Sequence, residues 1–275
     1  METLQAMRFQ EDRAYQVKEW STTSVDWECR AQMAAWCYQV VDFCHFRRET
    51  AAIAMSYMDR FMSISNQTDD RSYYRLACMS SLYLAVKIHE ASAMDPQFVA
   101  KLSHGAYAPK DIEHMETVLL KALQWRVNPP TAMAFARIAL KVVPSDVWSS
   151  DEMPETALEL VQMQIELALS KGSLMTTHAS MIAYCAMVNA FESLGLDFQV
   201  QEGIADLLAR ALQIHHLDAC DDIQRMLYES IVEEESTASN KRSRSERHLT
   251  TTTTPSKRRG VDMVEHSPRS ISAPQ

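Results

Sequence analysis

Residues whose types could do chemistry are few, and only one group has the composition of a metal site. His215, His216 and Asp218 lie just before a second acidic pair, Asp221 and Asp222. Imidazole and carboxylate groups ligate metals, so this group could support metal-assisted hydrolysis. Such a site needs further ligands on separate helices, however, and the dipole of a helix also favours acidic residues at its N-terminus. We interpret the group as a helix start and expect no metal.

Motifs for nucleotide, nucleophile and zinc chemistry are missing. The sequence has no G-x-G-x-x-G, G-x-x-x-x-G-K-[ST], G-x-S-x-G or H-E-x-x-H. The sequence has only 5 Gly among 275 residues, which makes a glycine-rich loop that binds phosphate through its backbone amides improbable. We therefore expect no catalytic centre and no cofactor.

Four charged residues in apolar surroundings are more informative. Arg30 begins an apolar helix face, and Asp59 lies in the apolar stretch 55–62. Buried charges are costly unless they are paired, so these two can be expected to pair with each other. Lys87 ends another apolar segment, and Glu116 lies in a third. From spacing alone, Lys87 could complement a helix C-terminus and Glu116 could lie on a solvated edge.

The segments that carry these residues have helical periodicity. Residues 1–95 contain neither Gly nor Pro, which favours helices over hairpins. The apolar pattern predicts five helices before residue 128, at 26–46, 48–64, 72–89, 95–103 and 109–124. The third has almost no polar face and should be central and surrounded.

Asn128-Pro129-Pro130 should end the first helical unit, because consecutive prolines break a helix. The pattern then predicts five further helices, near 131–142, 154–171, 174–194, 199–213 and 217–234. The predicted fold class is all-α, with two tandem five-helix units. The predicted parts are an N-terminal helix (1–22), a first unit (23–131), a second unit (132–235) and a tail (236–275).

Charge is divided unevenly between the predicted body and tail. Residues 236–275 carry eight Lys or Arg against three acidic residues, about +5, and are rich in Ser and Thr, so this segment should be disordered. The other residues include 19 basic and 33 acidic ones, about −14. An acidic body repels phosphate, which makes nucleic acid an unlikely partner and favours a protein partner.

Cysteine usage and hydropathy indicate an intracellular protein. The six Cys show no zinc-ligand spacing and lie mostly in apolar helical patterns, as buried free thiols do in a reducing compartment. No run of 18 apolar residues occurs, and the polar N-terminus has no basic flank leading to an apolar core. We expect neither a membrane span nor a secretory signal.

Several segments in order along the chain resemble the cyclin box. The intervals between Arg30, Asp59, Lys87 and Glu116 are 29, 28 and 29 residues, close to those of cyclins. The segments that carry the likeness are 29–36, 55–62, 84–87, 115–125 and Pro130-Thr131. Residues 54–62 and the ending Leu123-Gln124-Trp125 look most like D-type cyclins, and residues 36–44 are similar to an expanded cyclin group of diatoms.

The resemblance implies two tandem cyclin folds and a regulatory subunit, not an enzyme. Such a protein binds and activates a cyclin-dependent kinase in cell-cycle control, here at G1/S, in the nucleus with the cytoplasm as a second location. In cyclins, the residues matching Arg30 and Asp59 form a structural ion pair. The residues matching Lys87, Glu116 and Trp125 bind the regulatory helix of the kinase.

One surface departs from the family. Cyclins that recruit substrates through a basic-hydrophobic motif use an apolar patch, and the matching positions here are Cys29, Gln32, Met33, Trp36, Gln39 and Tyr74. Gln32 and Gln39 replace an apolar and an acidic residue, while Met33 and Trp36 could equally belong to the core. The resemblance therefore implies a degraded docking patch.

The tail has a functional interpretation and a simpler one as a solubilising segment. Thr254 and Ser267 each precede proline and are candidate phosphosites for proline-directed kinases, of the kind through which a ubiquitin ligase recognises D-type cyclins. The candidate nuclear import residues are Lys241, Arg242, Arg244, Lys257, Arg258 and Arg259.

Two rival functions remain open at the level of sequence. One is a transcription-associated protein with a cyclin fold that activates no kinase, which the acidic body opposes. The other is an all-α metallohydrolase that uses His215, His216 and Asp218.

Overall fold

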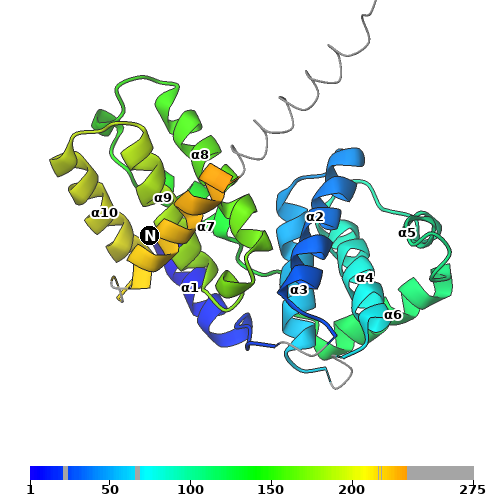
Figure 1. Ribbon diagram of the computed structural model, residues 1–275. Coiled ribbons are helices and arrows are strands. Elements are labelled where there is room, and N and C mark those ends of the chain that lie inside the picture. Colours follow the sequence, from blue (N-terminus) through cyan, green and yellow to red (C-terminus); the bar gives the residue numbers. More distant parts are fainter. Residues whose placement is uncertain (21–23, 66–68, 216, 218, 234–275) are drawn as a thin grey trace, which may run out of the picture. The chain divides into compact units, whose positions relative to one another are not determined.

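A computed structural model of the chain describes residues 1–20, 24–65, 69–215, 217 and 219–233. All regular structure in these residues is helical (Figure 1). Residues from Met1 to Glu233 form one compact unit. No helix among the described residues combines the length and apolar character needed to cross a membrane. The predicted tail, 236–275, lies outside the described residues.

The first unit predicted from the sequence folds into five helices. They are α2 (Trp27–Phe43), α3 (Glu49–Met62), α4 (Arg71–His89), α5 (Pro96–Leu102) and α6 (Pro109–Ala122). Three begin at an aspartate whose side chain accepts a hydrogen bond from a backbone N–H of the first turn: Asp26 for α2, Asp70 for α4 and Asp95 for α5. The carboxylates also suit the positive end of each helix dipole.

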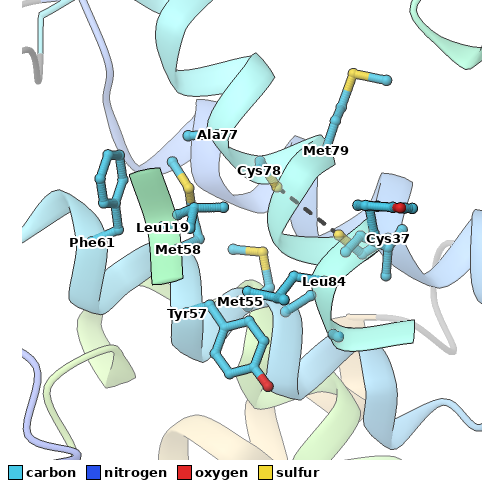
Figure 2. Packing of buried hydrophobic residues seen from close by; sticks show 14 of the residues in the cluster. Cys37, Met55, Tyr57, Met58, Phe61, Ala77, Cys78, Met79, Leu84 and Leu119 are labelled. Atoms are coloured by element: carbon cyan, nitrogen blue, oxygen red, sulfur yellow. Dashed lines mark hydrogen bonds between the residues drawn. The ribbon is translucent and has the colours of Figure 1, made fainter. Parts of the chain in front are cut away.

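Helix α4 lies at the centre of this fold, as its apolar sequence predicts. Every residue from Ala77 to Val86 is buried. Side chains from α2, α3, α4 and α6 meet in one core, among them Cys37, Met58, Cys78 and Leu119 (Figure 2). Alanines and serines in α4 let the neighbouring helices approach closely.

The second fold repeats this plan after Pro129-Pro130. Its helices are α7 (Ala132–Leu140), α8 (Met153–Ser170), α9 (Ala179–Ser193), α10 (Phe198–Leu212) and a last helix at 219–233, with short 3₁₀ turns η1 (Ser145–Val147) and η2 (Gly172–Leu174). Helix α9 is the buried centre of this core. It begins five residues later than predicted, because residues 172–178 form η2 and a turn.

The N-terminal helix α1 (Glu2–Ala14) packs on the second fold. Leu4 is fully buried in the second core. Glu11, which is 3% exposed, accepts hydrogen bonds from the backbone N–H of Ser180 (3.0 Å) and from its Oγ (2.7 Å). It thereby caps the first turn of α9. The helix ends at Ala14, short of the predicted residue 22, because the next residues turn toward the first fold, where Lys18 is bonded to Ser63.

We expect Glu11→Ala to lower the free energy of unfolding by about 2 kcal/mol, because it leaves the buried Ser180 N–H without its acceptor. Glu11→Gln keeps one acceptor oxygen and should lose clearly less. The exposed Glu2 on the same helix provides a control, Glu2→Ala, with an expected loss below about 0.5 kcal/mol. Chemical denaturation measures all three, and equal losses for Glu11→Ala and Glu2→Ala would contradict the capping role.

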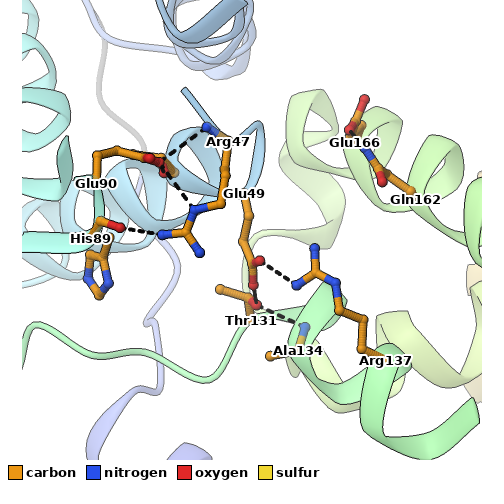
Figure 3. Close-up of polar contacts among 10 residues, drawn as sticks. Arg47, Glu49, His89, Glu90, Thr131, Ala134, Arg137, Gln162 and Glu166 are labelled. Carbon is orange, nitrogen blue, oxygen red and sulfur yellow. Dashed lines mark hydrogen bonds and ion pairs between the residues drawn. The ribbon is translucent and has the colours of Figure 1, made fainter. Parts of the chain in front are cut away.

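Ion pairs connect the two folds. Arg48 donates from Nε to Oε2 of Glu166 on α8 at 2.8 Å. Glu49, at the start of α3, accepts from Arg137 Nη1 on α7 at 2.6 Å and also from the hydroxyl of Thr131 (Figure 3). These contacts hold the beginning of α3 against the first two helices of the second fold.

A close backbone contact supports the same junction. Gly172 in η2 lies against the indole of Trp27, the first residue of α2. A Cβ at this position would come within 2.7 Å of the indole carbons, which a rigid ring cannot accommodate without moving. The absence of a side chain at Gly172 is therefore a packing requirement.

Candidate functional site

Lys87 and Glu116 form an ion pair at the surface of the first fold. Lys87 is in the last turn of α4 and Glu116 is on α6, and the Nζ to Oε1 distance is 2.9 Å. The Lys87 Nζ also lies 5.5 Å from the ring centroid of Tyr83, one helical turn earlier. The structure thus brings together two of the residues predicted to bind a partner.

The two members of this pair differ in exposure. The side chain of Lys87 is 50% exposed and that of Glu116 is 11% exposed. The hydrogen bond to Glu116 raises the pKa of Lys87, although partial burial opposes this. Lys87 therefore offers a positive charge to solvent, while Glu116 fixes where that charge lies.

The third predicted binding residue, Trp125, follows α6 and is 69% exposed. The helix ends in a Schellman motif, because the N–H of Trp125 bonds the Leu120 carbonyl and the N–H of Gln124 bonds the Lys121 carbonyl. An indole this exposed has no role in the core. It resembles the aromatic anchors of protein interfaces.

Ile88, also exposed in the last turn of α4, was not predicted. It is 41% exposed, and it follows Lys87 directly in α4. Its signal in the sequence is an isoleucine immediately beyond the lysine that closes an apolar helix. Lys87, Glu116, Ile88 and Trp125 together define the candidate site.

We expect Gln124→Gly to raise the free energy of unfolding by about 1 kcal/mol, because Gln124 has a φ of 53°, which glycine adopts without strain. The control Gln124→Ala keeps a Cβ and should give no gain. Thermal denaturation measures both. An equal gain from alanine would show that the left-handed backbone is not the cause.

Arg30 and Asp59 form a buried ion pair inside the first fold. Nε and Nη2 of Arg30 lie 2.9 and 2.7 Å from the two carboxylate oxygens of Asp59, and both side chains are nearly inaccessible. Burial lowers the pKa of Arg30, but the attraction and hydrogen bonds of Asp59 outweigh this and leave the pKa raised. Nη1 of Arg30 also donates to the Leu169 carbonyl of α8 at 2.6 Å. The pair therefore contacts the second fold.

The predicted docking patch is only partly at the surface. Gln32 and Gln39 are exposed, while Cys29, Met33 and Trp36 are half-buried and pack against the first core.

For Tyr74 the predicted place in a surface patch was wrong, because this residue is 2% exposed and its ring makes a tilted contact with that of Trp20, with 5.6 Å between ring centroids. The segment after α1 covers it, so Tyr74 is a core residue.

The metal-like group does not assemble a site in the described part of the chain. No cluster of three or more His, Cys, Asp or Glu side chains there could hold a metal. His215 is described, but His216 and Asp218 lie outside the described residues. The tail predictions are also outside them, namely Thr254, Ser267, Lys241, Arg242, Arg244, Lys257, Arg258 and Arg259. None of the six cysteines, all of which lie in described residues, forms a disulfide.

Comparison with known proteins identifies the family. Residues 2–128 match the family described as "Cyclin, N-terminal domain". Cyclin-D3-2 of Arabidopsis thaliana is 35% identical over 111 residues, which cover 39% of this chain and 30% of that protein. G1/S-specific cyclin-E1 of Gallus gallus is 30% identical over 113 residues, which cover 41% of this chain and 28% of that protein. This region of the chain is a cyclin N-terminal domain.

Solved structures show the same fold over more of this chain. A viral cyclin from herpesvirus saimiri superposes with a TM-score of 0.66 at 15% identity and covers 84% of this chain and 97% of its own. The CAK complex of Chaetomium thermophilum bound to ATP-gamma-S contains a chain with a TM-score of 0.51 at 15% identity, covering 85% of this chain and 72% of its own. Both folds of this chain therefore have structural counterparts.

The family match ends at residue 128, before the second fold begins. The matches span about 30% of the length of the first two relatives described above. The region of the family match, 2–128, contains all the residues of the candidate site and the pair Arg30–Asp59.

Proposed function

We propose that this protein binds and activates a cyclin-dependent protein kinase, as its regulatory subunit and without chemistry of its own. The observation that carries the proposal is the candidate site in the cyclin box, where a half-exposed Lys87 is paired with Glu116 and where Trp125 and Ile88 are also exposed. A site with an exposed indole and a fixed charge suits recognition of a protein surface.

The kinase would contribute a regulatory helix to this site. Trp125 and Ile88 offer apolar area for its side chains, and Lys87 offers a hydrogen-bonding cation for its backbone carbonyls or acidic residues. Docking would turn that helix so that its glutamate meets the lysine that positions ATP in the kinase, and the activation loop would open. This protein supplies rigid positioning, and the kinase performs the phosphoryl transfer.

The finer parts of the proposal are a role at G1/S and a nuclear location. The D-type and E-type relatives support G1/S, although a B-type cyclin of Rana japonica is also 29% identical over 167 residues. Nuclear import through Lys241, Arg242 and Lys257, and ubiquitin-ligase recognition of phosphorylated Thr254 or Ser267, are the proposed functions of the tail. Each can be tested by deleting residues 236–275.

The deciding experiment measures binding to a panel of purified, cyclin-free cyclin-dependent kinases and the phosphorylation of histone H1 by each mixture. Wild-type protein should bind and activate at least one kinase. Lys87→Glu/Glu116→Lys exchanges the two charges, so the ion pair can still form while the charge offered to the kinase is reversed. This variant should lose binding at least about ten-fold.

The matched control exchanges an ion pair of the same length elsewhere. Lys171 and Glu233 are 2.9 Å apart in the second fold, with side chains 34% and 69% exposed, so Lys171→Glu/Glu233→Lys should bind and activate as wild type does. If neither wild type nor control activates any kinase, the proposal is wrong. If both exchanged variants activate equally, the kinase does not use Lys87 and Glu116.

A further inference from the structure

The segment that displays Trp125 has a strained backbone. Gln124 and Trp125 are consecutive non-glycine residues with φ of 53° and 58°, in the left-handed region. A tryptophan is rare there, because its Cβ crowds the following carbonyl. Strained conformations of this kind persist only where the surroundings impose them, and they concentrate at functional sites. We refer to residues 123–127 as the Trp125 loop.

Two side chains from other helices hold the end of the Trp125 loop. The carbonyl of Val127 accepts a hydrogen bond from the hydroxyl of Tyr57 on α3, and it lies 3.0 Å from Nε2 of His89 on α4. Tyr57 Oη and His89 Nε2 are also 3.0 Å apart. Tyr57 is fully buried, and burial raises the pKa of its phenol, which keeps the hydroxyl protonated as a donor. His89 is two residues beyond Lys87, so these bonds fix the loop against the end of α4 that carries the candidate site.

A third side chain, Arg60 on α3, holds the adjacent carbonyl. Its Nη1 donates to the Arg126 carbonyl at 2.8 Å, and its guanidinium lies 4.7 Å from the ring centroid of Tyr15. Arg60 is 7% exposed, and no carboxylate among the described residues pairs with it. A buried cation without a counter-charge is costly, and here burial lowers its pKa. The bond to the Trp125 loop is the polar contact that offsets this cost.

We propose that Tyr57, Arg60 and His89 are positioning residues for partner binding, which impose the strained loop so that Trp125 points away from the core. The inference rests on the proposed function, since the partner that Trp125 meets is the kinase. The three donors converge on two successive carbonyls from two different helices. A loop needed only to connect α6 to α7 would gain nothing from an exposed indole held in this way.

The first test is a double-mutant cycle on binding to a purified cyclin-dependent kinase that wild-type protein binds. Tyr57→Phe removes only the hydroxyl and should weaken binding about five-fold, in line with the loss of one hydrogen bond. In a Trp125→Ala background the same substitution should change binding less than about two-fold, because the group it positions is gone. A purely structural role of Tyr57 predicts equal losses in both backgrounds.

The second test needs no kinase. Trypsin cleaves after Arg126 only when the Trp125 loop opens, so Tyr57→Phe should speed this cleavage about five-fold and leave cleavage after the exposed Lys101 unchanged. The matched control is Tyr107→Phe, which removes a hydroxyl bonded to the Ser72 carbonyl at 2.7 Å; Tyr107 precedes α6, whereas the Trp125 loop follows it. It should alter neither binding nor cleavage after Arg126.

The outcomes separate the two proposals. If wild-type protein binds no kinase, the proposed function is overturned, and faster cleavage in Tyr57→Phe would then show only that the hydroxyl holds the loop. If wild-type binding is intact but the cycle shows no coupling to Trp125, or cleavage after Arg126 is unchanged, the positioning role is overturned while the proposed function stands.

Discussion

Arg30→Ala should lower the free energy of unfolding by about 3 to 5 kcal/mol, because it leaves the Asp59 carboxylate buried without its counter-charge. Asp59 is only 4% exposed, and Arg30 supplies both of its charge-assisted hydrogen bonds. The variant also removes the donor to the Leu169 carbonyl, so the contact between the two folds weakens with the pair. Urea denaturation of the purified protein would measure the change.

Two further variants make this prediction specific. Lys87→Ala breaks an ion pair whose lysine is half exposed, and it should cost less than about 1 kcal/mol. Arg30→Met/Asp59→Leu replaces both buried charges with apolar side chains of similar size, and it should recover much of the stability lost in Arg30→Ala. Similar losses of unfolding free energy for Arg30→Ala and Lys87→Ala would contradict the assignment of Arg30–Asp59 as the structural pair and Lys87–Glu116 as the surface pair.

Much of the fold could be predicted because local patterns and tertiary packing agree. The apolar run in α4 can be buried only if helices surround it, and every residue from Ala77 to Val86 is buried. The double proline at 129–130 separates the folds for a local steric reason. The helix starts at Asp26, Asp70 and Asp95 likewise depend on side chains within the same turn.

The predictions for the start of α9 and for Tyr74 were wrong because residues far away in the sequence determine the local structure there. The start of α9 depends on Glu11, which is 169 residues away from the Ser180 that it caps. Tyr74 fits an exposed patch by its place in the cyclin box, but Trp20 and the segment after α1 cover it. The apolar periodicity of a single helix predicts neither the Glu11 cap on α9 nor the contact between Trp20 and Tyr74.

The candidate site could be predicted only in part from the sequence, because residues distant in the sequence also determine its structure. Lys87, Glu116 and Trp125 could be named because their segments resemble the cyclin box. The residues that hold the Trp125 loop could not be named, because Tyr57 and Arg60 are 70 and 66 residues from the carbonyls they bind. Arg60 is an ordinary helix residue in the sequence, and only its burial shows that its charge needs a partner.

Trp125→Ala should reduce kinase binding at least about 30-fold while changing the free energy of unfolding by less than about 0.5 kcal/mol. The indole is 69% exposed, so its removal leaves no cavity in the core. Buried against a partner, the same indole would account for a large share of the binding energy, since tryptophans are the commonest interface hot spots. Calorimetric titration of a purified cyclin-dependent kinase, beside thermal denaturation, measures both quantities.

Phe43 provides the matched control, because it is another exposed aromatic residue of the first fold, at the end of α2 and 74% exposed. Phe43→Ala removes a similar apolar area from a different surface, so it should leave kinase binding within about two-fold of wild type. Equal losses from Trp125→Ala and Phe43→Ala would point to a general effect of surface hydrophobicity. A loss confined to Trp125 would instead locate the kinase at the Trp125 loop, where a strained backbone already holds the indole in place before the partner arrives.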